Sequence, residues 1–221
     1  MPLEIDCVIM WYNVNLRGKA SMSKLFEPIT IRGMALDNRI IMLPMVLGLG
    51  LRSRKARAFY TERARGGVGA IVTSATPIDL FISDEAWEQP HGVSYFLEGL
   101  RSLVNDVHEA GAKIGMQLMQ PSLYYERATP PDDPEVKSQG EWVAPSARVE
   151  PTPSVHPMPD GQELRELSLK ETEQIIANFA KAAASVKEVG FDFVEVHGSH
   201  GTLPCQFFSP LDNHRGDKYG G

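Results

Sequence analysis

The chain has 221 residues, of which 43% are apolar and 23% charged, a composition typical of a folded globular domain and not of a disordered segment. Its net charge of −6 argues against binding to a nucleic-acid backbone, because that mode needs a basic face. The two cysteines, Cys7 and Cys205, are too few for a disulfide framework or a four-cysteine zinc site. We therefore expect reduced thiols and a cytoplasmic protein.

The N-terminal segment fits no element of secondary structure. No apolar run approaches the ~20 residues that a membrane span requires, and the short run at 7–12 follows two acidic residues instead of a basic region. We expect neither a membrane segment nor a secretory signal. Because Met22 begins a stretch typical of a natural start, residues 1–22 are predicted to be an extension of uncertain status and residues 23–221 the domain.

Strand and helix patterns then alternate along the chain. Two short apolar runs flank Arg32-Gly33 and predict a hairpin over 29–36, since glycine adopts a positive φ easily. Longer apolar runs are typical of strands covered on both faces, and apolar residues at helical spacing that end at glycine predict helices. The predicted strands are 39–45, 70–73 and 113–119, and the predicted helices are 54–65 and about 94–110.

The stretch from 120 to 166 interrupts this alternation. It holds nine of the sixteen prolines and shows little periodicity, so we predict a long functional loop there. Ser168 and Glu171 then form a capping box at the start of a helix that ends at Gly190, and a strand follows over 191–196. The segment after His197 is predicted to be a loop. The helix is expected to bury Ile175, Ile176, Phe179, Ala183 and Val186.

This order of elements predicts a parallel α/β sheet with right-handed crossovers. A doubly wound dinucleotide-binding sheet needs Gly-x-Gly-x-x-Gly after its first strand, and Gly48-x-Gly50 lacks the third glycine. The pattern therefore favours a (β/α)8 barrel. A complete barrel has eight strands, whereas the sequence predicts four, which indicates a half-barrel.

In a barrel the active site lies at the carboxyl ends of the strands, where this chain carries His197 and His200. Two imidazole donors that converge on one oxygen would polarise a carbonyl group or hold an oxyanion. Two unrelated surface histidines are the alternative. A metal site is the weaker hypothesis, because no third ligand stands at a recognisable spacing.

Gln117 ends another apolar strand, and its amide offers both a donor and an acceptor to the edge of a flavin or pyrimidine ring. The alternative is a core glutamine bonded to the backbone.

Several segments of the chain together resemble the old yellow enzyme family of FMN-dependent ene-reductases. They are Leu25–Pro28 with Asn38–Met45, Tyr60–Gly69, Gly111–Leu118, and His197–Gly201 continuing through Gln206–Pro210 to Tyr219–Gly221. The resemblance covers roughly residues 24–221. It implies a (β/α)8 barrel with FMN at its carboxyl mouth, so residues 23–221 would be the N-terminal half of such a domain.

The resemblance also implies roles for individual residues. Pro44, Met45 and Val46 would line the flavin through their backbone, Ala75 would contact its ring, and Gln117 would bind its pyrimidine edge. His197 and His200 would anchor the carbonyl oxygen of a small enone or enoate substrate. NAD(P)H would reduce the flavin, which would pass hydride to the substrate's β-carbon.

Three departures from the family pattern qualify these expectations. Thr202 stands where the family usually has a proton-donating tyrosine, and an alcohol is a far weaker acid than a phenol. Val46 stands where threonine or cysteine is common. The chain also holds only the first half of a barrel, so we expect a fragment, a half-barrel completed by another chain or a second copy, or a protein without catalysis that binds a partner.

Overall fold

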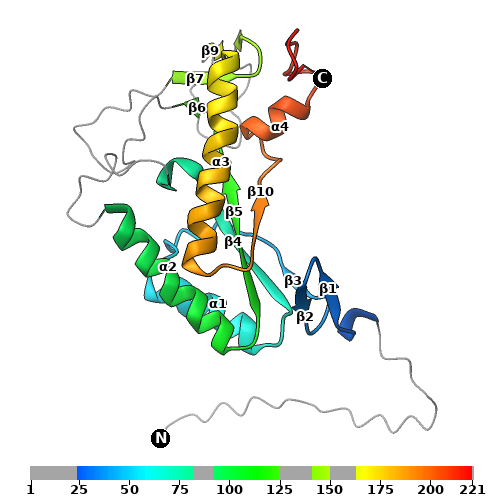
Figure 1. Cartoon of the computed structure of the whole chain (residues 1–221), viewed down its shortest axis with the longest axis vertical. Coiled ribbons are helices and arrows are strands. Elements are labelled where there is room, and N and C mark those ends of the chain that lie inside the picture. The colour runs from blue at the N-terminus through cyan, green and yellow to red at the C-terminus, as the bar shows by residue number, and fades with distance from the viewer. Residues whose placement is uncertain (1–23, 82–91, 125–140, 150–162, 221) are drawn as a thin grey trace, which may run out of the picture.

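A computed structural model describes residues 24–81, 92–124, 141–149 and 163–220. The extension predicted for residues 1–22 lies outside these residues. The described chain forms a parallel central sheet, helices packed on one side of it, and a smaller sheet beyond one end of it (Figure 1).

The central sheet has four parallel strands in the order β10-β5-β4-β3. The predicted strand at 113–119 is confirmed with the same bounds. The prediction of a strand over 39–45 is confirmed only for Ile41 and Met42 and is wrong for the other residues. Pro44 has no N–H to donate, and the chain leaves the edge of the sheet before it. The strands are β3 (Ile41–Met42), β4 (Ala70–Pro77), β5 (Lys113–Met119) and β10 (Phe193–Val196).

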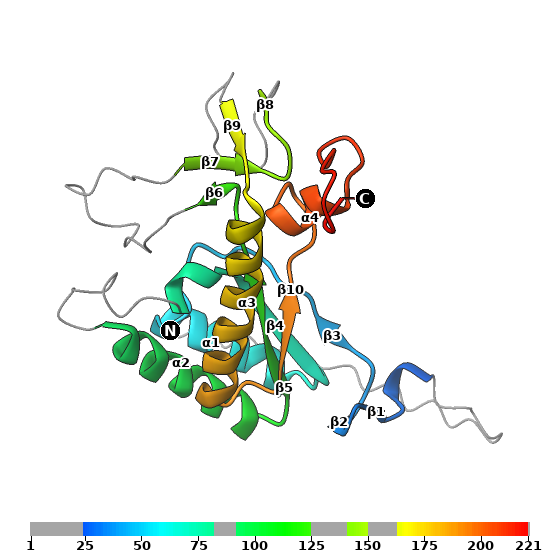
Figure 2. The same cartoon turned by 45° about the horizontal axis from the view of Figure 1, so that its top comes forward.

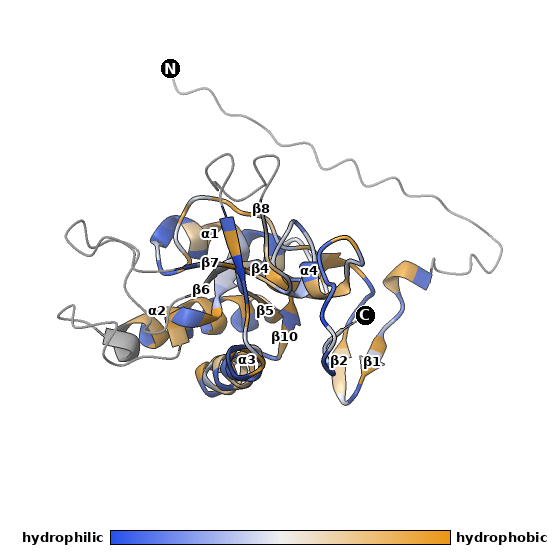
Figure 3. Cartoon of the chain, turned by 90° about the horizontal axis from the view of Figure 1, so that it is seen from above, coloured by the Kyte–Doolittle hydropathy of each residue, from blue (hydrophilic) through white to orange (hydrophobic). Residues whose placement is uncertain are grey.

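Three helices connect these strands and form an arc around one side of the sheet (Figure 3). Consecutive helices contact each other, and each also contacts the sheet. Helices on one side only are typical of a barrel wall, because a doubly wound sheet carries helices on both faces. No helix in the described ranges is long and apolar enough to cross a membrane. The helices are α1 (Arg54–Arg65), α2 (Gly92–Glu109) and α3 (Leu169–Val189).

A predicted hairpin precedes the sheet. Its strands are β1 (Ile29–Ile31) and β2 (Met34–Leu36), after a short 3₁₀ turn, η1, at Lys24–Phe26. Arg32 and Gly33 both have positive φ, at 47° and 89°, as a two-residue hairpin turn requires.

The core lies between the helices and the sheet. Ile114, Met116 and Leu118 alternate along β5, are almost fully buried, and belong to the main hydrophobic cluster together with side chains of all three helices. Gly115 lies between them on the opposite face, where the ring of Phe193 from β10 occupies the space that a Cβ atom would need. The two faces of β5 therefore differ: one packs into the core beneath the helices, and the other carries Gly115 and Gln117.

Helix α3 begins and ends as the sequence predicts. The Ser168 hydroxyl accepts a hydrogen bond from the backbone N–H of Glu171, whose carboxylate accepts one from the backbone N–H of Ser168, and Gly190 ends the helix with φ 111°. The prediction that Ile176 is buried is wrong, because 51% of its surface is exposed. No element in the described part of the chain covers that side of the helix.

The prediction of a structureless loop over 120–166 is also wrong. Parts of this stretch form a second four-stranded sheet in the order β6-β7-β9-β8, which lies beyond the carboxyl ends of the central strands (Figure 2). Its strands have two to four residues, too few to show a period in the sequence. They are β6 (Leu123–Tyr124), β7 (Glu141–Ala144), β8 (Arg148–Val149) and β9 (Glu163–Glu166).

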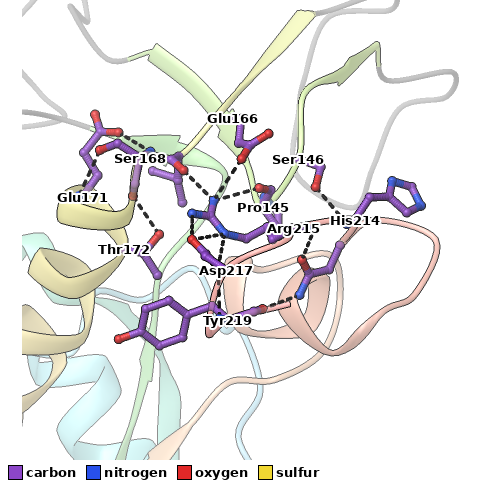
Figure 4. Close-up of polar contacts among 12 residues, drawn as sticks. Pro145, Ser146, Glu166, Ser168, Glu171, Thr172, His214, Arg215, Asp217 and Tyr219 are labelled. Atoms are coloured by element: carbon purple, nitrogen blue, oxygen red, sulfur yellow. Dashed lines mark hydrogen bonds and ion pairs between the residues drawn. The ribbon is translucent and has the colours of Figure 1, made fainter. Parts of the chain in front are cut away.

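The segment after β10 contains a helix that the sequence did not predict, α4 (Leu203–Phe208), which starts at a proline-containing first turn. Arg215, whose side chain is only 3% exposed, connects the chain after α4 to the second sheet (Figure 4). Its guanidinium group donates to the carbonyls of Pro145 and Leu167 and forms an ion pair with Asp217. One side chain thus joins three separate segments.

We expect Glu171→Gln to destabilise the protein at pH 7 by about 1–2 kcal/mol. The Arg165 guanidinium, 2.9 Å from both carboxylate oxygens, lowers the pKa of Glu171 to about 2, against the opposing effect of burial. A lowered pKa stabilises the fold above the ordinary value of 4.5 and loses that effect as the pH falls toward 2.

Urea denaturation across this pH range should therefore show the variant and the wild type converging in acid. The exposed Glu188→Gln, in the last turn of the same helix, is the control. A difference between variant and wild type that is independent of pH would contradict the assignment.

We expect Arg215→Lys to lower the free energy of unfolding by about 2–3 kcal/mol, because an ammonium group cannot reach two carbonyls and a carboxylate together. Urea denaturation measures this. Arg101→Lys, at an exposed residue 3.7 Å from Glu98, should be neutral. Equal midpoints for the two variants would refute the role of Arg215.

Candidate functional site

The carboxyl ends of the central strands lie at one end of the sheet, the upper end in Figure 1, and all the predicted site residues lie on or just after those strands. Pro44, Met45 and Val46 follow β3. Ala75 lies in β4 and Gln117 in β5. His197 is the residue directly after β10, which places the histidine loop beside the other strand ends.

The segment after β3 presents backbone groups and exposed side chains. Val46 is 83% exposed, and Met45 is also exposed. Pro44, Met45 and Val46 belong to no helix or strand, and within the described ranges their backbone groups have no hydrogen-bond partner. Free backbone groups at a strand end suit the edge of a flat heterocycle.

Ala75 lies at an irregularity in β4. The pairing of β4 with β5 shifts register between Thr73 and Thr76, so Ala75 has no regular partner and is half-buried. Bulges of this kind re-aim a side chain at the rim of a barrel. A hydrogen bond from the Ser74 backbone N–H to the Tyr60 hydroxyl, 3.3 Å long, fixes the bulge against α1.

Gln117 is a buried amide with a charged partner. Its side chain is 6% exposed, and its Nε2 donates to Oε1 of Glu195 at 2.5 Å. The two residues are directly opposite in the parallel pairing of β5 with β10. Its Oε1 has no hydrogen-bond partner among the described residues. The alternative of a core glutamine bonded to the backbone is therefore not what the structure shows.

The histidine loop brings two imidazole rings together. The ring centres of His197 and His200 are 5.2 Å apart, and Nδ1 of His200 is 3.3 Å from Nε2 of His197. The Ser199 hydroxyl lies 3.3 Å and 3.1 Å from the two Nδ1 atoms. His200 holds this geometry at a φ of 54°, a left-handed conformation that is unusual for a residue with a Cβ atom.

Thr202 stabilises this loop through its side-chain hydroxyl. It is fully buried at the N-terminus of α4, and its hydroxyl donates to the carbonyls of His197, at 2.7 Å, and Ser199, at 3.0 Å. The hydroxyl is engaged with the backbone rather than presented to the two rings. The geometry therefore points to a structural function, and a catalytic role for Thr202 stays a prediction.

Two polar residues of this region were not predicted from the sequence. Gln206 in α4 donates from its Nε2 to the Gly201 carbonyl at 2.7 Å and also to the Ser122 hydroxyl, so it connects the histidine loop to the end of β5. Glu195 pairs with Gln117. The available signal for Glu195 was an acidic residue in an otherwise apolar strand, two positions before His197.

The groups at this end of the sheet are an amide acceptor, free backbone groups and a pair of imidazoles. In the described ranges, no cluster of three or more His, Cys, Asp or Glu side chains is arranged to hold a metal ion. The set can bind a polar heterocycle at its edge and donate hydrogen bonds to one oxygen.

Comparisons with known proteins agree with this geometry. Residues 24–221 match the model of the NADH:flavin oxidoreductase / NADH oxidase family. An NADPH dehydrogenase of Clostridium acetobutylicum is 39% identical over 207 residues, which are 90% of this chain and 55% of the relative. An NADPH dehydrogenase of Bacillus subtilis is 36% identical over 208 residues, with the same coverage of both chains. The chain thus spans about half the length of the curated relatives that it matches.

Solved structures give the same result. The old yellow enzyme of Pichia sp. AKU4542 superposes with a TM-score of 0.67 at 28% identity, over 90% of this chain and 52% of that one. A morphinone reductase superposes with a TM-score of 0.66 at 27% identity, over 89% of this chain and 55% of that one. The match to the family model extends over nearly the whole sequence, from residue 24 to residue 221. This chain therefore belongs to the NADH:flavin oxidoreductase / NADH oxidase family.

Proposed function

We propose that residues 23–221 form the N-terminal half of an FMN-binding (β/α)8 barrel that transfers hydride from NAD(P)H, through the flavin, to the C=C bond of an α,β-unsaturated carbonyl compound. The main support is that Gln117 and the His197–His200 pair lie at the same end of a parallel sheet, on the neighbouring strands β5 and β10. FMN is the cofactor of this family and reduced nicotinamide its reductant. The relatives named as NADPH dehydrogenases and the reductases of known structure support the same reaction class.

The residues present fit one part of FMN, its ring system. When bound, the flavin supplies the chemistry of accepting and delivering hydride. The amide of Gln117 would bind the pyrimidine edge, and the backbone of Pro44, Met45 and Val46 would line the ring beside Ala75. In barrels of this kind the phosphate is held after the seventh and eighth strands, which the four described strands do not provide. We therefore expect weak binding of FMN by this chain alone.

The two histidines would bind the substrate carbonyl. Each neutral imidazole carries one N–H, and two such donors directed at one oxygen favour the charge that develops on it as hydride reaches the β-carbon. Because the Thr202 hydroxyl donates to two carbonyls, the proton for the α-carbon would come from water. Protonation would then be slower than with the phenol that the family usually places there.

A second candidate function, association with a partner or a second copy, is supported by uncovered apolar surface. Among the strands that the structure describes, β3 and β10 are the outer strands of the central sheet, and each has one side without a neighbouring strand. A groove of about 530 Å³ between α3 and α4 is lined by Ile176, Phe179, Val196, Phe207 and Phe208. Exposed edges and apolar grooves of this kind are usual places of association.

Titration with FMN and a phenolic carbonyl ligand tests the proposed function. We expect flavin fluorescence to be quenched by the full chain with weak affinity. His197→Ala and His200→Ala should each lower the affinity for the phenolic ligand about tenfold, which corresponds to a loss of roughly 1.4 kcal/mol of binding free energy. His214→Ala, which removes an exposed imidazole outside the site, is the matched control. Unchanged affinity in both site variants would exclude the anchoring role.

Sedimentation velocity distinguishes the two candidate functions, flavin-dependent reduction and association. A stable dimer that binds no flavin and reduces no enone would favour association as the function. A monomer that retains stoichiometric FMN would contradict our expectation of an incomplete phosphate site.

Thr202→Val separates a structural hydroxyl from a catalytic one. We expect the free energy of unfolding to fall by about 1–2 kcal/mol, because the carbonyls of His197 and Ser199 lose their side-chain donor. Thr202→Ser keeps the hydroxyl and should be close to the wild type. Unchanged stability together with lost enone reduction would instead identify a proton donor.

A further inference from the structure

The strand β10 carries a carboxylate on the face of the sheet that bears the site. Glu195 stands opposite Gln117 in the parallel register, with Phe193 opposite Gly115 two pairs earlier, so the four side-chain positions share one face. Val194 and Val196, on the other face of β10, are exposed apolar residues. The acidic residue is therefore placed on the barrel side by the period of the strand.

The contact between the two side chains is close and charge-assisted. Nε2 of Gln117 lies 2.5 Å from Oε1 of Glu195, and the glutamine is almost entirely buried. Hydrogen bonds that involve an ionised acceptor are roughly twice as strong as neutral ones. A half-buried carboxylate in an apolar strand costs free energy unless it has such a partner, and Gln117 provides it.

This contact decides which end of the amide faces a ligand. A glutamine amide has a donor nitrogen and an acceptor oxygen on opposite sides of one carbon atom, and nothing in the residue itself prefers one orientation over the other. A carboxylate only accepts hydrogen bonds, so it selects the orientation with Nε2 toward Glu195. The oxygen Oε1 is then left as an acceptor.

We infer that Glu195 is a positioning residue, which holds Nε2 of Gln117 and so presents Oε1 of the same amide to a ring N–H of the bound flavin. The identity of that ligand rests on the proposed function, whereas the orientation of the amide does not. The pyrimidine edge of an isoalloxazine carries one N–H between two carbonyls, and an oriented amide oxygen matches that N–H. Glu195 itself contacts neither flavin nor substrate in this assignment.

Side-chain NMR of the full chain without cofactor tests the orientation directly. We expect one Nε2 proton of Gln117, assigned with Gln117→Leu, to lie downfield of the other glutamine side-chain protons because it donates to a carboxylate. Glu195→Gln, which keeps the volume and removes the charge, should reduce this downfield shift. Glu195→Ala, which removes the acceptor, should abolish it. Glu188→Gln, an exposed carboxylate in α3, should leave the resonance unchanged. A resonance that persists in both Glu195 variants would overturn the inference.

A double-mutant cycle with FMN as the probe tests the consequence. Glu195→Ala should weaken FMN binding by about five- to tenfold, the loss of one oriented hydrogen bond. In a Gln117→Ala background the same substitution should change the affinity by less than about twofold, because Glu195 acts through Gln117. Equal losses in both backgrounds would overturn the inference. Absence of FMN binding by the wild type would refute the proposed function, and the NMR comparison would still decide the role of Glu195.

Discussion

The parallel pairing of β10 with β5 sets the geometry on which the candidate site depends. It places Glu195 opposite Gln117, and the same ladder continues with a hydrogen bond from the His197 backbone N–H to the Leu118 carbonyl, 2.8 Å long. Side chains alternate between the faces of a strand, so a slip of one residue would turn Glu195 toward α3 and displace the start of the histidine loop. Gly115 helps to hold this register, since only a residue without a side chain leaves room for the Phe193 ring.

The histidine loop is built on this pairing by buried polar contacts. The Leu203 backbone N–H donates to the Gln120 carbonyl at 2.9 Å, which fastens the start of α4 to the end of β5. Thr202 and Gln206 satisfy carbonyls within the loop, and Arg215 joins the chain beyond it to the second sheet (Figure 4). The left-handed backbone of His200 is held by these surroundings, as strained residues in functional loops commonly are.

Local patterns predicted the elements that depend on local signals. The helix at 54–65, the strand at 113–119 and the capping box of α3 follow from helical spacing, an uninterrupted apolar run and paired capping side chains, and all three are confirmed. The second sheet could not be predicted in this way. Its short strands are defined by pairing with distant residues, such as β7 with β9, and carry no period of their own.

The site shows the same division between local and tertiary information. The strand ends located Gln117 and the two histidines, because polar residues there interrupt apolar runs. The partnership of Gln117 with Glu195 depends on which strands are neighbours, and the engagement of the Thr202 hydroxyl depends on the path of the loop. Ile176 was expected to be buried because helical spacing reports an apolar face and not whether anything covers it.

That uncovered face links the folding of this chain to its surroundings. Val196 and Phe208, beside Ile176 in the groove between α3 and α4, are 55% and 84% exposed. Any molecule that covers them in the native chain, and has no affinity for the unfolded one, raises the fraction of folded molecules by mass action. The folded fraction would then depend on the concentration of that molecule as well as on the sequence of this chain.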